Sequence, residues 1–244
     1  GSLPGVQVFY YCTTITLPQS CSDWIIGYGQ CCRNSTITNL ASPSSSDQYV
    51  YAMINNQNGV CNNSPSFTNL PVPYFCPGQE IFYNHGAVDI DGDSLVYEFT
   101  SPKIGGGLAG AGGPGSGDPN GCQGVQPIPG CAPPYTNVRF RSPVYSFDQP
   151  MAGDPIVSID TFTGLITGVP QTLGQFVVGV SVKEYRNGVL INTLNRDFQF
   201  NVEDCESTVV AQIQSDNTVN DQNYLFTTCG EQTIDFVNES FLEA

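Results

Sequence analysis

The chain has 244 residues, of which 40% are apolar but only 12% are charged, about half the share that is usual in soluble domains. Its 22 acidic residues outweigh 7 Lys and Arg residues, so the net charge of −15 would repel nucleic-acid phosphates and anionic lipid surfaces. A single histidine, His85, excludes His-rich zinc sites. We therefore expect no nucleic-acid partner, no direct membrane insertion and no catalytic activity.

Strand-like runs rich in Val, Ile, Tyr, Phe and Thr recur along the chain, whereas helical periodicity is nearly absent. A tight hairpin is predicted at Asn187-Gly188, because this pair readily takes the positive φ angles of such a turn. Short strands separated by turn residues predict an all-β fold of tandem immunoglobulin-like β-sandwiches. The runs span residues 6–17, 48–54, 95–100, 156–159, 175–182, 189–194 and 196–202.

Two polar segments predict domain boundaries. The Asn-, Ser- and Pro-containing segment at 61–67 predicts that an N-terminal sandwich spans residues 1–61. The segment at 202–205 predicts that a second sandwich spans 62–203, including a Gly-rich surface insertion at 105–121. Residues 204–244 are too few for a third sandwich of about 100 residues. They are a tail, the first strands of a truncated domain, or strands docked on their neighbour.

The cysteines indicate the redox environment. They are even in number, form no C-x-x-C pair and accompany one histidine, so thioredoxin-like and zinc sites are not expected. We predict instead up to five disulfides, formed outside the cytoplasm. Spacing favours the pairs Cys122–Cys131 and Cys205–Cys229. The ten candidates are Cys12, Cys21, Cys31, Cys32, Cys61, Cys76, Cys122, Cys131, Cys205 and Cys229.

The strongest chemical pattern is an acidic turn that contains Asp89, Asp91 and Asp93. Gly92 permits a sharp bend that gathers the three carboxylates around one centre, where they repel one another unless a cation or protons neutralise them. Hard oxygen ligands favour Ca²⁺ over a transition metal. The glycine spacing is not that of an EF-hand. The alternatives are a solvated acidic turn without metal and a pair of glycosidase carboxylates, which would need two differentiated acids on separate elements.

Several motifs together resemble a known family. Segments 62–67, 89–97, 160–170 and 174–180 resemble, in this order, dystroglycan-type cadherin-like domains. Further segments resemble repeats of giant Bacteroidota surface proteins that carry PKD (polycystic-kidney-disease-type) modules, leave by type IX secretion and include the gliding-motility adhesin. These are 31–34, 37–40, 183–188 and 196–199. Residues 229–240 look like the first strands of a PKD module, which makes 204–244 the start of a truncated PKD-like module.

The resemblance implies a non-catalytic structural and adhesive segment of a large filament on the bacterial cell surface. Its expected partners are neighbouring domains of the same long chain, with surface glycans or the substratum as targets. It implies Ca²⁺ as the cofactor, with Asp89, Asp91 and Asp93 as ligands and Asn63 and Glu184 as further candidates.

An extracellular carbohydrate-binding module is the alternative function. In that case exposed aromatic side chains would stack on sugar rings, and the candidates are Tyr10, Tyr11, Tyr49 and Tyr51. Their alternation along the chain suits a half-buried strand equally well. A hydrolase that uses the acidic turn is a third hypothesis.

Overall fold

The computed structural model describes residues 9–30, 32–46, 48–57, 61–69, 74–104 and 137–205, together with short strands beyond residue 208. Antiparallel strands make up nearly all of its regular structure, and the one helical turn in the described part is η1 (Pro43–Ser45). The all-β class predicted from the sequence is confirmed.

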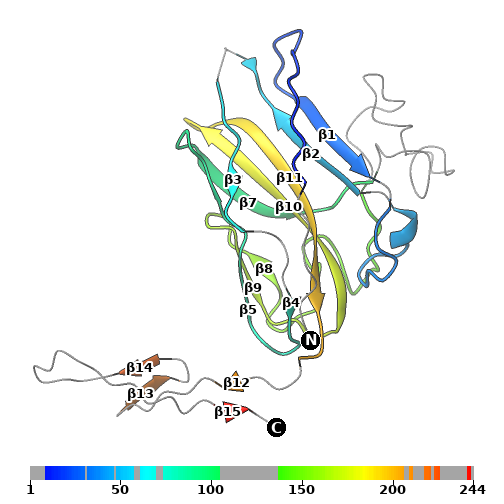
Figure 1. Cartoon of the computed structure of the whole chain (residues 1–244), viewed down its shortest axis with the longest axis vertical. Coiled ribbons are helices and arrows are strands. Elements are labelled where there is room, and N and C mark those ends of the chain that lie inside the picture. Colours follow the sequence, from blue (N-terminus) through cyan, green and yellow to red (C-terminus); the bar gives the residue numbers. More distant parts are fainter. Residues whose placement is uncertain are drawn as a thin grey trace, which may run out of the picture. The chain divides into compact units, whose positions relative to one another are not determined.

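The main sheet is built on two long strands, β10 (Gly174–Arg186) and β11 (Val189–Val202), which Figure 1 shows side by side. They form the predicted hairpin, in which Asn187 and Gly188 have φ angles of 52° and 78°. On one side β10 pairs with β7 (Ser94–Thr100); on the other, β11 pairs with β2 (Gln48–Ile54), which pairs with β1 (Trp24–Gln30). The short β4 (Tyr74–Phe75) runs parallel to the end of β11.

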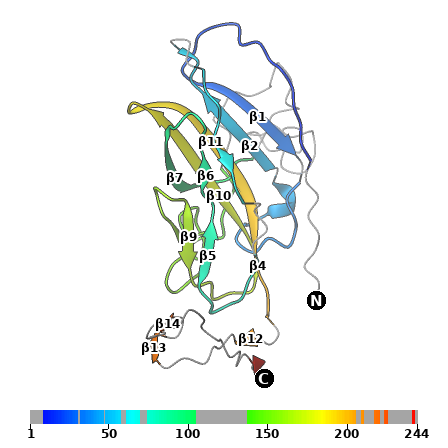
Figure 2. The same cartoon turned by 60° about the vertical axis from the view of Figure 1, so that its left-hand side comes forward.

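Smaller sheets complete the unit. The strand order is β5 (Ile81–Asn84), β9 (Leu165–Gly168) and β8 (Ser158–Ile159) in one of them. In the other, β3 (Ser66–Phe67) pairs with β6 (Ala87–Val88). Figure 2 shows β5 and β9 side by side. The arrangement is sandwich-like.

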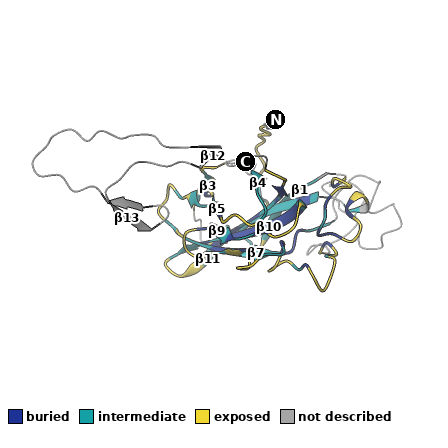
Figure 3. Ribbon diagram, turned by 90° about the horizontal axis from the view of Figure 1, so that it is seen from below, coloured by how far each residue is buried: buried dark blue, intermediate teal, exposed yellow. Residues whose placement is uncertain are grey.

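The hydrophobic core lies between the main sheet and the smaller sheet formed by β5, β9 and β8. Alternate residues of β10 point into it, and Ile81 and Ile166 oppose them from β5 and β9. In Figure 3 the buried residues concentrate in the strands and the exposed ones in the surrounding loops. The core-facing residues of β10 are Phe176, Val178, Val180 and Val182.

The strands on either side of residue 61 share one sheet, since Ala52 of β2 pairs with Leu194 of β11. Residues Gly1–Glu203 form one compact unit. The boundary expected between residues 61 and 62 therefore does not coincide with the edge of a sheet. The physical reason is that β1 and β2 alone would make a marginal two-stranded ribbon, whereas extending the main sheet lets them share its core.

Residues Asp204–Ala244 form the second unit. Within it β12 (Val209–Val210) pairs with β15 (Phe241–Leu242), and β13 (Asn217–Asn220) pairs with β14 (Asn223–Leu225). The Gly-rich insertion at 105–121 lies outside the described residues.

Candidate metal centre

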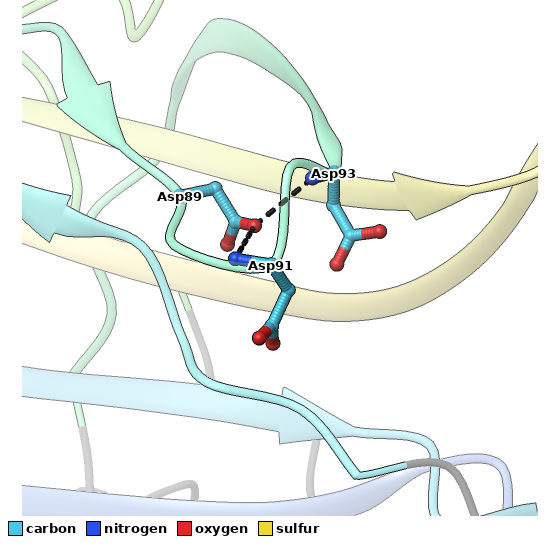
Figure 4. Close-up of side chains that lie close together, drawn as sticks. All are labelled: Asp89, Asp91 and Asp93. Carbon is cyan, nitrogen blue, oxygen red and sulfur yellow. Dashed lines mark hydrogen bonds between the residues drawn. The ribbon is translucent and has the colours of Figure 1, made fainter.

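The acidic turn connects β6 to β7. Asp89 closes it, because its Oδ1 accepts hydrogen bonds from the backbone N–H groups of Asp91 (3.0 Å) and Asp93 (2.9 Å) (Figure 4). Gly92 has a φ angle of 79°, a backbone conformation that residues other than glycine rarely adopt. One carboxylate oxygen from each aspartate lies within 4.8 Å of the others. The turn thus gathers the three carboxylates, as the bend predicted at Gly92 implies.

Strand pairing brings Glu184 to the same turn. β7 begins directly after Asp93, and in the β7–β10 ladder Leu95 lies opposite Glu184. The Glu184 side chain is fully buried (0% exposed). Its Oε2 accepts a hydrogen bond of 2.9 Å from Asn192 Nδ2, whereas its Oε1 has no hydrogen-bond partner.

Burial is the main reason why the pKa of Glu184 is raised from 4.5 to about 7. The amides of Asn192 and Asn62 favour the charged form, while the carboxyl group of Asp93 and the charge of Asp89 oppose it. The Glu184 carboxyl group thus interacts with Asp93 and Asp89, although it does not belong to the three carboxyl groups whose oxygens lie within 4.8 Å of one another.

Asn63 holds Asp91 in place. Its backbone N–H donates to Asp91 Oδ2 at 2.7 Å, and its Nδ2 donates to Oδ1 at 3.0 Å. These two bonds are the main reason why the pKa of Asp91 lies below its usual value. As a donor Asn63 positions Asp91, and it would offer an oxygen to a cation only after its amide had rotated. The structure therefore brings Asn63 to the gathered aspartates, and the β7–β10 pairing brings Glu184 next to the start of β7.

Arg186, the last residue of β10, is the counter-ion of the turn, and the sequence analysis missed it. Its Nε and Nη2 donate to the two carboxylate oxygens of Asp93 at 2.7 and 2.5 Å, and Nη2 lies 3.3 Å from Asp91 Oδ2. The guanidinium also donates to the Cys61 carbonyl and to Asn62 Oδ1, each at 2.9 Å. The hydrogen bond from Arg186 is the main reason why the pKa of Asp93 is lowered. A signal existed in the sequence, because Arg186 stands two residues after Glu184 in a chain with few cations.

The donor set fits a hard divalent cation. Arg186 pairs with Asp91 and Asp93, but its single positive charge does not neutralise the three aspartate carboxylates of the turn. Among the described residues, two of the buried oxygens without a hydrogen-bond partner belong to this group: Asp89 Oδ2 and Glu184 Oε1. Buried polar atoms are normally paired, and carboxylate oxygens are ligands that Ca²⁺ prefers.

His85 is a poor candidate for a catalytic base. It is 1% exposed and lies among aromatic rings, stacked on Phe198 with ring centroids 5.4 Å apart. Its Nε2 lies 3.2 Å from Nη1 of Arg196. Burial, followed by the charge of Arg196, lowers the pKa of His85 to about 3, so the ring is neutral and packed as a core residue.

The cysteines fall into three groups. Cys32, Cys76 and Cys205 are disulfide-bonded. Three others carry free thiols in this structure, so the described residues do not show the full five disulfides that the sequence allows: Cys12, Cys21 and Cys61. One local contact occupies a free thiol, since Cys21 Sγ lies 2.9 Å from Asp23 Oδ1. The other four lie outside the described residues: Cys31, Cys122, Cys131 and Cys229.

The structure separates the four candidate tyrosines. Tyr10 and Tyr11 are 87% and 80% exposed, whereas Tyr49 is buried and Tyr51 is half-buried. Tyr11 stacks on the exposed Tyr28 of β1, with ring centroids 6.1 Å apart. An exposed aromatic pair therefore exists, and Tyr11 is the one predicted residue that belongs to it.

Comparisons with protein-family models, curated proteins and solved structures found no match for this chain. In the part of the chain that the structure describes, no helix has the length and apolar character needed to cross a membrane.

Proposed function

We propose that this chain is a non-catalytic structural and adhesive segment of a large filament on a bacterial cell surface, similar to a gliding-motility adhesin, and that Ca²⁺ stiffens it at the acidic turn. The observation that carries the calcium part is the gathering of three aspartate carboxylates next to Glu184, whose buried Oε1 has no hydrogen-bond partner. The sandwich-like all-β fold and the disulfide-bonded cysteines support the structural and extracellular parts.

The residues that would hold the ion come from separate parts of the fold. Asp89, Asp91 and Asp93 belong to the turn between β6 and β7, and Glu184 belongs to β10. Ca²⁺ would supply the positive charge that allows all four carboxyl groups to ionise together. It would thereby tie the turn between β6 and β7 to β10 of the main sheet.

The non-catalytic part is supported by the chemistry of the acidic residues and of His85. Asp91 and Asp93 have lowered pKa values and are held by Asn63 and Arg186, so they remain charged and paired. Glu184 has the raised pKa expected of a general acid, but its side chain is fully buried away from any substrate.

A carbohydrate-binding module is the second candidate. The stacked and exposed pair Tyr11 and Tyr28, with the exposed Tyr10 beside it in sequence, is the observation that favours it. Aromatic faces of this kind offer apolar area together with a polar hydroxyl group. Selective binding on a glycan array that is lost in Tyr11→Ala would support this candidate over the adhesive filament.

Thermal unfolding tests the calcium part. We expect millimolar Ca²⁺ to raise the free energy of unfolding by about 1–2 kcal/mol relative to EDTA, if its Kd is about 10⁻⁴–10⁻³ M as in extracellular modules. Mg²⁺ should do less, because it keeps its own water and demands a tighter octahedron. Asp89→Asn should abolish the calcium effect while keeping an oxygen that closes the turn.

Asp160→Asn is the matched control. Asp160 also closes a turn, since its Oδ1 accepts the backbone N–H groups of Phe162 and Thr163. It does not belong to the carboxylate cluster. Its variant should retain the full calcium effect, and an equal loss in both variants would show that the effect is not located at the acidic turn. The adhesive part needs a separate assay: beads coated with the chain should attach to the substratum more firmly in Ca²⁺ than in EDTA.

A further inference from the structure

Arg186 occupies the oxygens that a calcium ion would need. Both oxygens of Asp93 accept hydrogen bonds from its guanidinium, and both oxygens of Asp91 are bonded, one to Asn63 alone and one to Asn63 and Arg186 together. Within the carboxylate group, only Asp89 Oδ2 and Glu184 Oε1 are left without a partner. Two oxygens are far fewer than the six to eight that Ca²⁺ takes.

We propose that Arg186 is a built-in competitor for the metal: it neutralises the turn when no metal is bound, and Ca²⁺ binds by displacing its guanidinium from Asp91 and Asp93. This inference rests on the calcium site proposed above and concerns what regulates that site. The displacement would free both oxygens of Asp93 and would leave Asp91 Oδ2 bonded to Asn63 alone. With Asp89 Oδ2 and Glu184 Oε1 this gives four carboxylate oxygens without a hydrogen-bond partner, to which water molecules would add the remaining ligands of a Ca²⁺ shell.

The position of Arg186 suits such an exchange. Its side chain is 29% exposed, and it is the last residue of β10 before the Asn187-Gly188 turn. The guanidinium can therefore move into water by rotation about its side-chain bonds, with no change in the β10–β11 ladder. Glu184, two residues earlier on the same face of the strand, is fully buried and stays in place.

The exchange also changes what holds the segment before β3. Arg186 binds the carbonyl of Cys61 and Oδ1 of Asn62, so its departure removes both ties. Oδ1 of Asn62 then becomes available as a further oxygen ligand. Asn63 keeps the segment attached through Asp91. Calcium would thus replace a single flexible cation with an ion that several backbone segments share.

Isothermal titration with Ca²⁺ on the whole chain tests the proposal, with Arg186→Gln as the main variant. Removing the competitor should tighten Ca²⁺ binding by about ten-fold or more, because a like charge that must be displaced costs affinity. The same variant should unfold at a lower temperature in EDTA, since its acidic turn has lost its counter-ion. The opposite signs of these two effects distinguish a competitor from a merely structural residue, which would change stability alone.

Lys183→Gln is the matched control. It removes the same charge from the same strand, but Lys183 pairs with Glu98 (2.6 Å), and neither residue belongs to the turn. Its calcium affinity should stay within about two-fold of the parent chain. An equal gain in both variants would mean that net charge alone sets the affinity, which overturns the proposal. Arg186→Lys serves as a second variant should Arg186→Gln not fold, and it should tighten binding to a smaller extent.

The outcomes separate the two proposals. If the parent chain binds Ca²⁺ and Arg186→Gln binds it equally or more weakly, Arg186 is not a competitor and the calcium site itself stands. If neither the parent chain nor any Arg186 variant binds Ca²⁺ at millimolar concentration, the calcium site is refuted, and the competition proposal is refuted with it.

Discussion

Arg33 forms a buried bidentate ion pair with the carboxylate of Asp197, which lies 164 positions later in the sequence. Nη1 and Nη2 of Arg33 lie 2.9 and 2.5 Å from the two oxygens of Asp197, and the side chains are only 3% and 1% exposed. Nη2 of Arg33 also donates to the carbonyl of Lys103 at 3.1 Å. The pair fixes the segment after β1 to the middle of β11.

Breaking this pair should destabilise the chain strongly. Arg33→Met leaves the buried Asp197 carboxylate without its partner, and burial already raises the pKa of Asp197 above its usual value. We expect a loss of about 3–5 kcal/mol in the free energy of unfolding, measured by urea denaturation. Arg139→Met, at an exposed arginine, is the control and should cost less than about 0.5 kcal/mol. A loss below 1 kcal/mol in Arg33→Met would contradict the importance of the pair.

The raised pKa of Glu184 predicts a pH effect in metal-free protein. Because the folded chain holds this proton up to a pH of about 7, whereas the unfolded chain releases it near 4.5, the contribution to stability is full below pH 4.5 and is lost as the pH rises to about 7. The difference corresponds to at most about 3 kcal/mol. Glu184→Gln, which mimics the protonated form, should unfold at a higher temperature than the parent chain at pH 8 in EDTA, and at an equal temperature at pH 4.5.

His85 also makes stability depend on pH, so the effect of Glu184 is measured as the difference in stability between Glu184→Gln and the parent chain. The lowered pKa of His85 has the opposite sign, so its contribution is full above pH 6.5 and is lost as the pH falls toward 3. Subtracting the parent curve from that of Glu184→Gln cancels this contribution. Glu98→Gln, which removes a half-exposed carboxylate from β7, is the control. A gap that does not grow between pH 4.5 and pH 8 in Glu184→Gln would refute the pKa assignment.

Arg196 depends on an aromatic neighbour. Its guanidinium carbon lies 3.9 Å from the centre of the Phe67 ring and 5.7 Å from that of Phe198. Phe67→Ala removes the aromatic ring nearest to the Arg196 guanidinium and also removes contacts with the hydrophobic core. We expect the free energy of unfolding, measured by urea denaturation, to fall by about 3–4 kcal/mol. Phe82→Ala is the matched control, because Phe82 is 66% exposed on β5 and its loss should be close to neutral. Similar losses in both variants would contradict the role of Phe67.

Much of the fold follows from local sequence patterns. The predicted run at 48–54 coincides with β2, and the Asn187-Gly188 hairpin is confirmed. The runs at 189–194 and 196–202 are one strand, because Asn195 pairs with Ser181 without interrupting the ladder. The prediction of a strand at 6–17 is wrong for residues 9–17, which lie outside any strand.

β1 was missed because two glycines interrupt its pattern. The structure explains Gly27, since a Cβ atom there would lie within 2.4 Å of atoms of the Tyr49 ring and hydroxyl group. That close approach depends on the partner strand, which no local pattern encodes.

The candidate site was predictable only in part. Asp89, Asp91 and Asp93 lie within five consecutive residues, so their gathering follows from one turn bent at Gly92. Arg186 reaches the turn only through the β7–β10 register, in which Tyr185 lies opposite Ser94. Pairing of residues some 90 positions apart cannot be read from composition or spacing.

The most direct measurement is a crystal structure of the chain grown in Ca²⁺ well above its Kd. We predict an ion with oxygen ligands at about 2.3–2.6 Å that include Asp89 Oδ2 and Glu184 Oε1, with the Arg186 guanidinium displaced from Asp93. A well-ordered acidic turn that holds no ion, with Arg186 still bonded to both oxygens of Asp93, would contradict the account.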